Sequence, residues 1–118
     1  MTDLVKDISS IELETINNIN SSKSINTLRA YKSDFRHFLN FCKKNNFRPL
    51  PADPKIVSFY ITHLSSNSKV STLKRRLASI SVIHRIKGHY IDIKHPLIIE
   101  NLMGIQRKLG VFQKSKDV

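Results

Sequence analysis

The chain has 118 residues, the length of one domain, and its hydrophobic (40%) and charged (25%) fractions are those of a protein that folds. Twenty Lys and Arg residues against nine Asp and Glu give a formal net charge of +11, an excess that favours a polyanionic partner, most often nucleic acid. A single Cys excludes an internal disulfide. The sequence has no apolar run of roughly 18 residues and no secretion signal, so we expect a cytoplasmic protein without a membrane partner.

The first predicted element is a helix over about residues 10–20. Ser9 and Glu12 have the spacing of a capping box, in which each side chain pairs with a free backbone N–H of the first turn. The residues before Ser9 could add one turn or form a loose arm. The Asn- and Ser-rich segment 17–22 then predicts a linker to the next helix.

The second helix is predicted over about residues 24–46 and has the clearest periodicity. Apolar residues recur there at alternating steps of three and four: Leu28, Tyr31, Phe35, Phe38 and Cys42. A basic stripe lies roughly a quarter to a third of a turn away: Arg29, Lys32, Arg36 and Lys43. One edge of this helix can therefore pack on a core while the adjacent edge faces an anion.

The third helix is predicted to begin at Asp53-Pro54, because Asp is a favoured N-cap and Pro is tolerated at the first helical position. The fourth helix is predicted over about residues 69–87 and ends at Gly88. His84 lies among aliphatic residues on its apolar face, which favours a hydrogen-bonded core histidine over a metal ligand.

The fifth helix is predicted to start at His95-Pro96 and to end near Gly110, before a frayed tail at 113–118. Three Gly, four Pro and no sustained alternation of apolar and polar residues argue against a sheet. The fold class is therefore all-α. The short connections suit consecutive helices packed as hairpins.

Catalytic, metal and cofactor motifs were not found in the sequence. Asp34 has no second carboxylate at helical spacing, as a paired general acid and base would require. The five His residues form no HExxH motif and no zinc set with Cys. Cys42, on the apolar edge of its helix, is interpreted as a buried small hydrophobe. We expect a binding protein with no catalytic residue, no metal and no cofactor.

Two helices combine long cations with small polar residues, which is the composition that a DNA groove accepts. On the second helix the candidates are Thr27, Arg29, Ala30, Lys32, Ser33 and Arg36. At the start of the fourth helix they are Lys69, Ser71, Thr72, Lys74, Arg75 and Arg76. Helical spacing places Lys74 and Arg75 there on a second cationic stripe, together with Ser71 and Ala78.

Structural roles compete with DNA contact at several of these positions. Thr27 and Thr72 have the placement of first-turn capping residues. Lys32 and Arg36 fit a solvated surface, and the stem of Arg76 lies close enough to the apolar side to pack there.

The same segments resemble a known family. The run from Ser24 to Ser66, followed by KVSTLKRRLASISVIHRIKGH at 69–89, resembles the N-terminal core-binding domain of tyrosine site-specific recombinases, or phage integrases, and of Cre-like members in particular. The matching elements are the helix start at Ser24 and Thr27, CKKNN at 42–46, PADP at 51–54 and the Ser71-Thr72 pair.

The resemblance implies a small orthogonal bundle of four to five helices of the SAM-like class, which forms half of a clamp around duplex DNA. In that family the first helix packs against a neighbouring protomer in a tetrameric synapse. By the same resemblance five positions match groove-contacting ones: Arg29, Ala30, Ser33, Ser71 and Arg75.

The family's catalytic Tyr and its supporting residues lie in a separate C-terminal domain, so the resemblance implies that this chain is the non-catalytic part of a longer recombinase. It divides the chain into an N-terminal arm or first helix (1–22), a DNA-binding core (23–110) and a linker stub (111–118). The expected role is DNA integration and recombination in a bacterium, phage or similar mobile element, with the protein at the nucleoid. The alternatives are a helical regulator or RNA binder, and a protein-interaction adaptor with a basic face.

Overall fold

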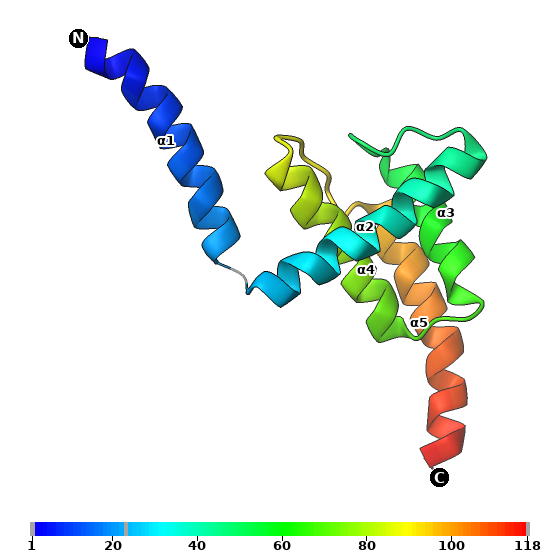
Figure 1. Cartoon of the computed structure of the whole chain (residues 1–118). Coiled ribbons are helices and arrows are strands. Elements are labelled where there is room, and N and C mark those ends of the chain that lie inside the picture. The colour runs from blue at the N-terminus through cyan, green and yellow to red at the C-terminus, as the bar shows by residue number, and fades with distance from the viewer. Residues whose placement is uncertain (1, 23, 118) are drawn as a thin grey trace.

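The computed structural model describes the backbone of residues 2–22 and 24–117 and the side chains of residues 7–19, 21–22 and 24–110. The described residues form five helices and no strand: α1 (Thr2–Ser21), α2 (Ile25–Asn45), α3 (Pro54–Ser65), α4 (Val70–Ile86) and α5 (Pro96–Asp117) (Figure 1). This confirms the predicted all-α class. No described helix combines the length and apolar content that crossing a membrane requires.

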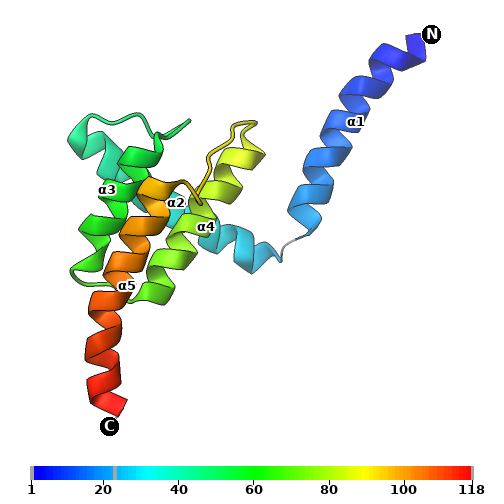
Figure 2. The same ribbon diagram turned by 180° about the vertical axis from the view of Figure 1, so that it is seen from behind.

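Helices α2 to α5 form a bundle, and α1 projects from it (Figures 1 and 2). The main packed pairs are α2 with α4 and α3 with α5. The expectation that consecutive helices pack as hairpins is therefore wrong. The connecting segments 46–53 and 87–95 are long enough to carry the chain across the bundle, so each helix packs most closely on the next but one.

The core of the bundle receives large side chains from all four helices. The most deeply buried of these are at most 1% exposed: Phe38 of α2, Tyr60 of α3, Leu73 and Ile80 of α4, and Ile98 of α5. The rings of Phe38 and Tyr60 meet edge to face with their centroids 5.0 Å apart. Burial of these apolar surfaces is the main force that holds α2 and α4 in place.

Local capping explains why α2, α3 and α4 have their predicted bounds. The Ser24 side chain accepts a hydrogen bond from the backbone N–H three residues on, and Asp53 accepts one from the N–H two residues on. α2 ends before its C-cap residue Asn46, which has a φ of 58°, and α4 ends two residues before Gly88, which has a φ of 79°. Both values lie in the left-handed region that terminates helices.

His84 is a core histidine, as predicted, and it holds the loop between α2 and α3. Its ring is fully buried, and Nδ1 lies 2.8 Å from the carbonyl oxygen of Ile80 and therefore donates to it. Nε2 is then free to accept from the backbone N–H of Ala52 at 2.9 Å. Both bonds need the neutral ring, and burial lowers the pKa of His84 accordingly.

Two predicted helix bounds are wrong. α1 begins at Thr2 and continues to Ser21, so Ser9 lies inside the helix and cannot cap it, and most of the predicted linker 17–22 is helical. No Gly or Pro interrupts residues 2–21, and Asn and Ser lower helix propensity without breaking a helix. α5 likewise continues past Gly110 to Asp117, because one interior Gly costs only about 1 kcal/mol.

Candidate nucleic-acid interface

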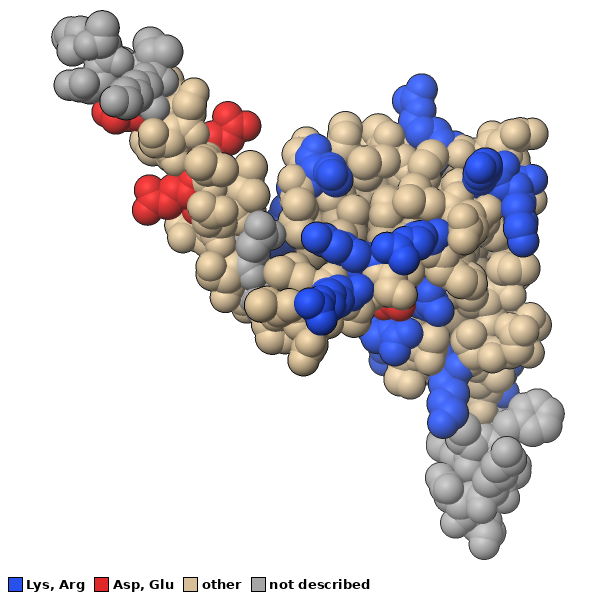
Figure 3. Space-filling view, in the orientation of Figure 1, with Lys and Arg blue, Asp and Glu red and all other residues tan. Residues whose placement is uncertain are grey.

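A basic surface covers α2 and α4 on the face shown in Figure 3, where Lys and Arg side chains gather across both helices. We use the name basic surface for the exposed cations among the DNA-contact candidates of α2, of α4 and of the N-cap of α4: Arg29, Lys32, Arg36, Lys69, Lys74 and Arg75. The described acidic side chains of α1 lie on the projecting helix and do not cover it. The two cationic stripes predicted from sequence are therefore neighbours and open to solvent.

The α2 candidates are presented to solvent with one exception. Those that are exposed are Arg29, Ala30, Lys32, Ser33 and Arg36. Thr27 is half-buried, its hydroxyl lies 2.7 Å from that of Ser24, and its backbone N–H is the one that the Ser24 cap satisfies. Its contacts are those of the capping role that the sequence allowed.

The α4 candidates divide into two groups. Lys69, Ser71, Lys74 and Arg75 are exposed, whereas Thr72 and Arg76 are half-buried. Small residues at 71 and 78 leave the backbone of α4 accessible between the long cations, which lets a large ligand approach the helix closely.

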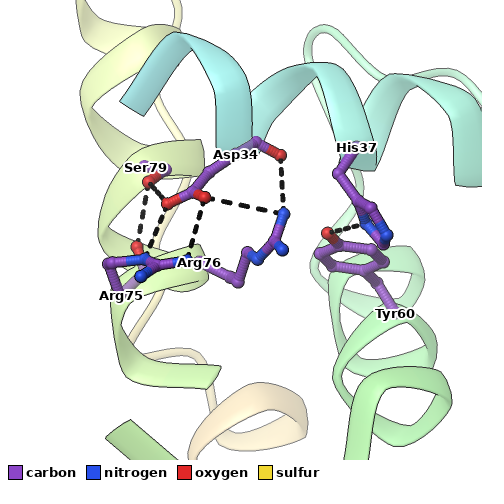
Figure 4. Close-up of polar contacts among 6 residues, drawn as sticks. All are labelled: Asp34, His37, Tyr60, Arg75, Arg76 and Ser79. Atoms are coloured by element: carbon purple, nitrogen blue, oxygen red, sulfur yellow. Dashed lines mark hydrogen bonds and ion pairs between the residues drawn. The ribbon is translucent and has the colours of Figure 1, made fainter. Parts of the chain in front are cut away.

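A buried carboxylate joins the two helices beneath the basic surface (Figure 4). Asp34 of α2 is only 6% exposed. Arg75 donates to it twice, from Nε at 3.0 Å and from Nη2 at 3.2 Å, and the Ser79 hydroxyl donates at 2.8 Å. Arg76 adds an ion pair at 3.6 Å. A buried charge needs several such partners to offset its loss of water, and here all of them come from α4.

The Arg76 side chain lies between this ion pair and the interior of the bundle. Its side chain is only 19% exposed, and its Nη1 also donates to the backbone carbonyl of Asp34 at 3.5 Å. On the α3 side of Arg76, the buried Tyr60 and the exposed His37 of α2 form a hydrogen bond of 2.8 Å between the phenol oxygen and Nδ1 (Figure 4). Burial raises the pKa of Tyr60 to about 12 and is the main cause that lowers the pKa of His37, so the phenol keeps its proton and donates it to the ring.

Sequence reasoning missed the role of Asp34. It recognised that this acid stands alone among bases on α2, but the partners are 41 to 45 positions away on α4. The available signal was an unpaired acid near the apolar edge of an otherwise basic helix, since such a charge is seldom buried without a counter-ion. Because Arg75 and Arg76 carry this ion pair, removal of either positive charge would lower stability as well as weaken any ligand contact.

The described residues contain no cluster of three or more His, Cys, Asp or Glu side chains that could hold a metal ion. Cys42 is fully buried, as predicted, and burial raises the pKa of its thiol to about 11. At neutral pH it is therefore an inert thiol and not a nucleophile.

Comparison with known proteins agrees with the resemblance seen in the sequence. The family model described as "Phage integrase, N-terminal SAM-like domain" matches residues 13–88. An "Integrase/recombinase xerD homolog" from Selenomonas ruminantium is 30% identical over 109 residues, which cover 90% of this chain and 32% of that protein. The chain thus spans about a third of the length of this relative. The helical fold and these two matches show that the chain belongs to the phage integrase family of tyrosine recombinases and contains the N-terminal SAM-like domain of that family.

Proposed function

We propose that this chain is the duplex DNA-binding module of a tyrosine recombinase and that the basic surface faces the DNA. The observation that carries the proposal is the open cationic surface formed jointly by α2 and α4. In this role the chain clamps the recombination site for the catalytic domain of the family. The DNA-binding part is the bundle of α2 to α5, and α1 is a separate arm.

The residue types suggest how the contacts are divided. Lys32, Arg36 and Lys74 are exposed and reach phosphates, which supply most of the affinity whatever the sequence. Ala30 and Ser71 are short and exposed, so the helices can approach base edges beside them. Duplex DNA has a groove wide enough for a helix to enter.

The positions of the aromatic residues argue against single-stranded ligands. Proteins that bind single strands stack bases on exposed aromatic rings. The large exposed aromatic side chains among the described residues are Phe59 on α3 and Tyr90 in the loop after α4, and neither belongs to the basic surface. A double-stranded partner therefore fits this surface better than single-stranded RNA or DNA.

α1 supports a second partner, a neighbouring recombinase protomer on the same DNA. Isoleucines at 8 and 11 are each 60% exposed on a helix that projects from the bundle. Apolar side chains in such a position favour contact with another protein. The family's synaptic tetramer, in which first helices contact adjacent protomers, is the assembly that we propose for it.

The test is a titration of labelled duplex DNA by fluorescence anisotropy at several salt concentrations. If the surface neutralises about 5–7 phosphates, log K falls with log[salt] at a slope of roughly −5 to −6. Unlabelled single-stranded DNA and RNA, added as competitors, should displace the labelled duplex poorly. A flat salt response, or equal competition by RNA, would contradict the proposal.

A pair of charge reversals tests whether the basic surface is the face that contacts DNA. Arg36→Glu removes a cation of the basic surface, whereas Lys55→Glu makes the same change on α3, where the ammonium lies over the Phe59 ring. We expect Arg36→Glu to weaken binding about 10-fold and to reduce the salt slope, and Lys55→Glu to have a much smaller effect. Equal losses would show that α2 does not face the DNA.

A further inference from the structure

Arg75 differs from the other cations of the basic surface because it is held in one orientation. Among the residues that the structure describes, Lys32, Arg36 and Lys74 form no ion pair, so their side chains can follow whichever phosphate lies nearby. The guanidinium of Arg75 is instead bound along one edge to a carboxylate that is almost fully buried.

The ion pair between Arg75 and Asp34 is bidentate. Nε and Nη2 of Arg75 donate to the two different carboxylate oxygens of Asp34, at 3.0 and 3.2 Å. Two parallel bonds fix both the position and the plane of the guanidinium, which one bond would not do. The Arg75 side chain nevertheless remains 54% exposed.

A second edge of the guanidinium, formed by Nη1 and Nη2, is not used by this pair. An arginine has five N–H groups, and the pair with Asp34 uses one on Nε and one on Nη2. The outer N–H of Nη2 and an N–H of Nη1 are parallel and point away from Asp34. This is the donor spacing that matches O6 and N7 of guanine in the major groove.

Asp34 is itself prevented from moving. Ser79 donates to the same carboxylate at 2.8 Å, and Arg76 pairs with it from a half-buried position. The formal charges of Asp34, Arg75 and Arg76 sum to +1, so the cluster stays attractive to DNA.

We propose that Arg75 is a sequence-reading residue that contacts a guanine edge, and that Asp34 is the positioning residue that holds it there. This rests on the proposed function, because it assigns a role within the same surface. The other cations bind without regard to sequence, and Arg75 supplies preference for particular base pairs. Loss of its fixed orientation should then reduce discrimination more than affinity.

The experiment selects duplexes bound by the 118-residue chain from a randomised pool, and then measures affinity for the enriched duplex and for a scrambled one. Arg75→Lys keeps the positive charge but cannot make a bidentate ion pair with Asp34. The matched control is Arg85→Lys, the same change at an exposed residue of α4 that has no ion pair among the described residues.

For Arg75→Lys we expect the ratio of enriched to scrambled affinity to fall at least about 10-fold, with loss of preference at one or two adjacent positions that contain guanine. Affinity for scrambled DNA should stay within about 3-fold, and Arg85→Lys should retain the preference. Asp34→Asn, studied under conditions where circular dichroism shows it folded, should lose the same base preference.

Other results would overturn the assignment. Arg75→Lys that keeps the preference, or that weakens both duplexes equally, would make Arg75 a structural or phosphate-contacting residue, and this variant is informative even if Asp34→Asn fails to fold. Wild-type protein that binds duplexes without enriching any sequence would also refute a reading role. Wild-type protein that binds no duplex at all would instead overturn the proposed function.

Discussion

α1 and the α2–α4 pair are the two charged regions of this molecule, and they differ in sign, burial and attachment. Residues 2–21 carry four acids and one base, whereas α2 and α4 carry many bases and Asp34 as their one acid. The isoleucines at 8 and 11 of α1 are largely exposed, but α2 and α4 bury their apolar faces against each other and against α3 and α5.

This difference separates two ways of presenting a surface. The α2–α4 surface has a set geometry, because core packing and a buried ion pair hold both helices, and a surface of this kind suits recognition of a rigid ligand. α1 is a helix whose apolar side chains at 8, 11 and 13 are not covered by its own bundle, which suits contact with another protein. Stability should therefore depend strongly on the α2–α4 region and little on α1.

The largest effect is expected in the core under α2. Phe38→Ala removes a fully buried ring that contacts Tyr60, and should lower the free energy of unfolding by about 3–5 kcal/mol. Urea denaturation followed by circular dichroism measures this. A loss below 1 kcal/mol would show that α2 is not held by the core.

The next largest loss of stability is expected on breaking the ion pair between α2 and α4. Asp34→Ala leaves two arginines without their counter-ion, and should lower the free energy of unfolding by about 2–3 kcal/mol, less than for a fully buried pair because water screens the half-exposed Arg75. Asp7→Ala, which removes an exposed acid from α1, is the control and should change stability by less than about 0.5 kcal/mol. Equal effects of the two changes would mean that the network contributes nothing.

A smaller effect should appear on acidification. The pKa of His84 is lowered in the folded protein, so its contribution to stability is fully present above the unfolded pKa of about 6.5 and is lost as pH falls through the lower folded value. Urea midpoints measured between pH 7.5 and pH 5 should therefore decrease. His84→Gln should reduce this dependence and leave the part due to His37, whose pKa is also lowered, whereas His89→Gln, a change at an exposed neighbour, should preserve it.

The smallest effect is expected on α1. Ile11→Ala changes a residue that is 60% exposed and should alter the free energy of unfolding of the isolated chain by less than about 0.5 kcal/mol. The same variant should weaken association of protomers on a long duplex, measured by gel shift. A loss of stability comparable to that of Phe38→Ala would mean that α1 packs on its own bundle.

Local signals in the sequence predicted the middle of the molecule well. Ser24, Asp53 and Gly88 mark helix ends through bonds and backbone angles that span only a few residues. At α1 and α5 such signals predicted the wrong helix bounds. Ser9 resembles a cap and Gly110 resembles a stop, but neither outweighs the helical preference of the residues around it.

What the sequence by itself determined is the all-α class, the bounds of α2 and α4, the start of α3, the buried state of His84 and Cys42, and the presence of two cationic stripes. These follow from periodicity, capping and composition, which are properties of neighbouring residues. Only the tertiary structure decided that α2 packs on α4, that the stripes share one face and that Asp34 binds Arg75. Such contacts join residues about 40 positions apart, and their existence depends on how helices cross, which local sequence does not specify.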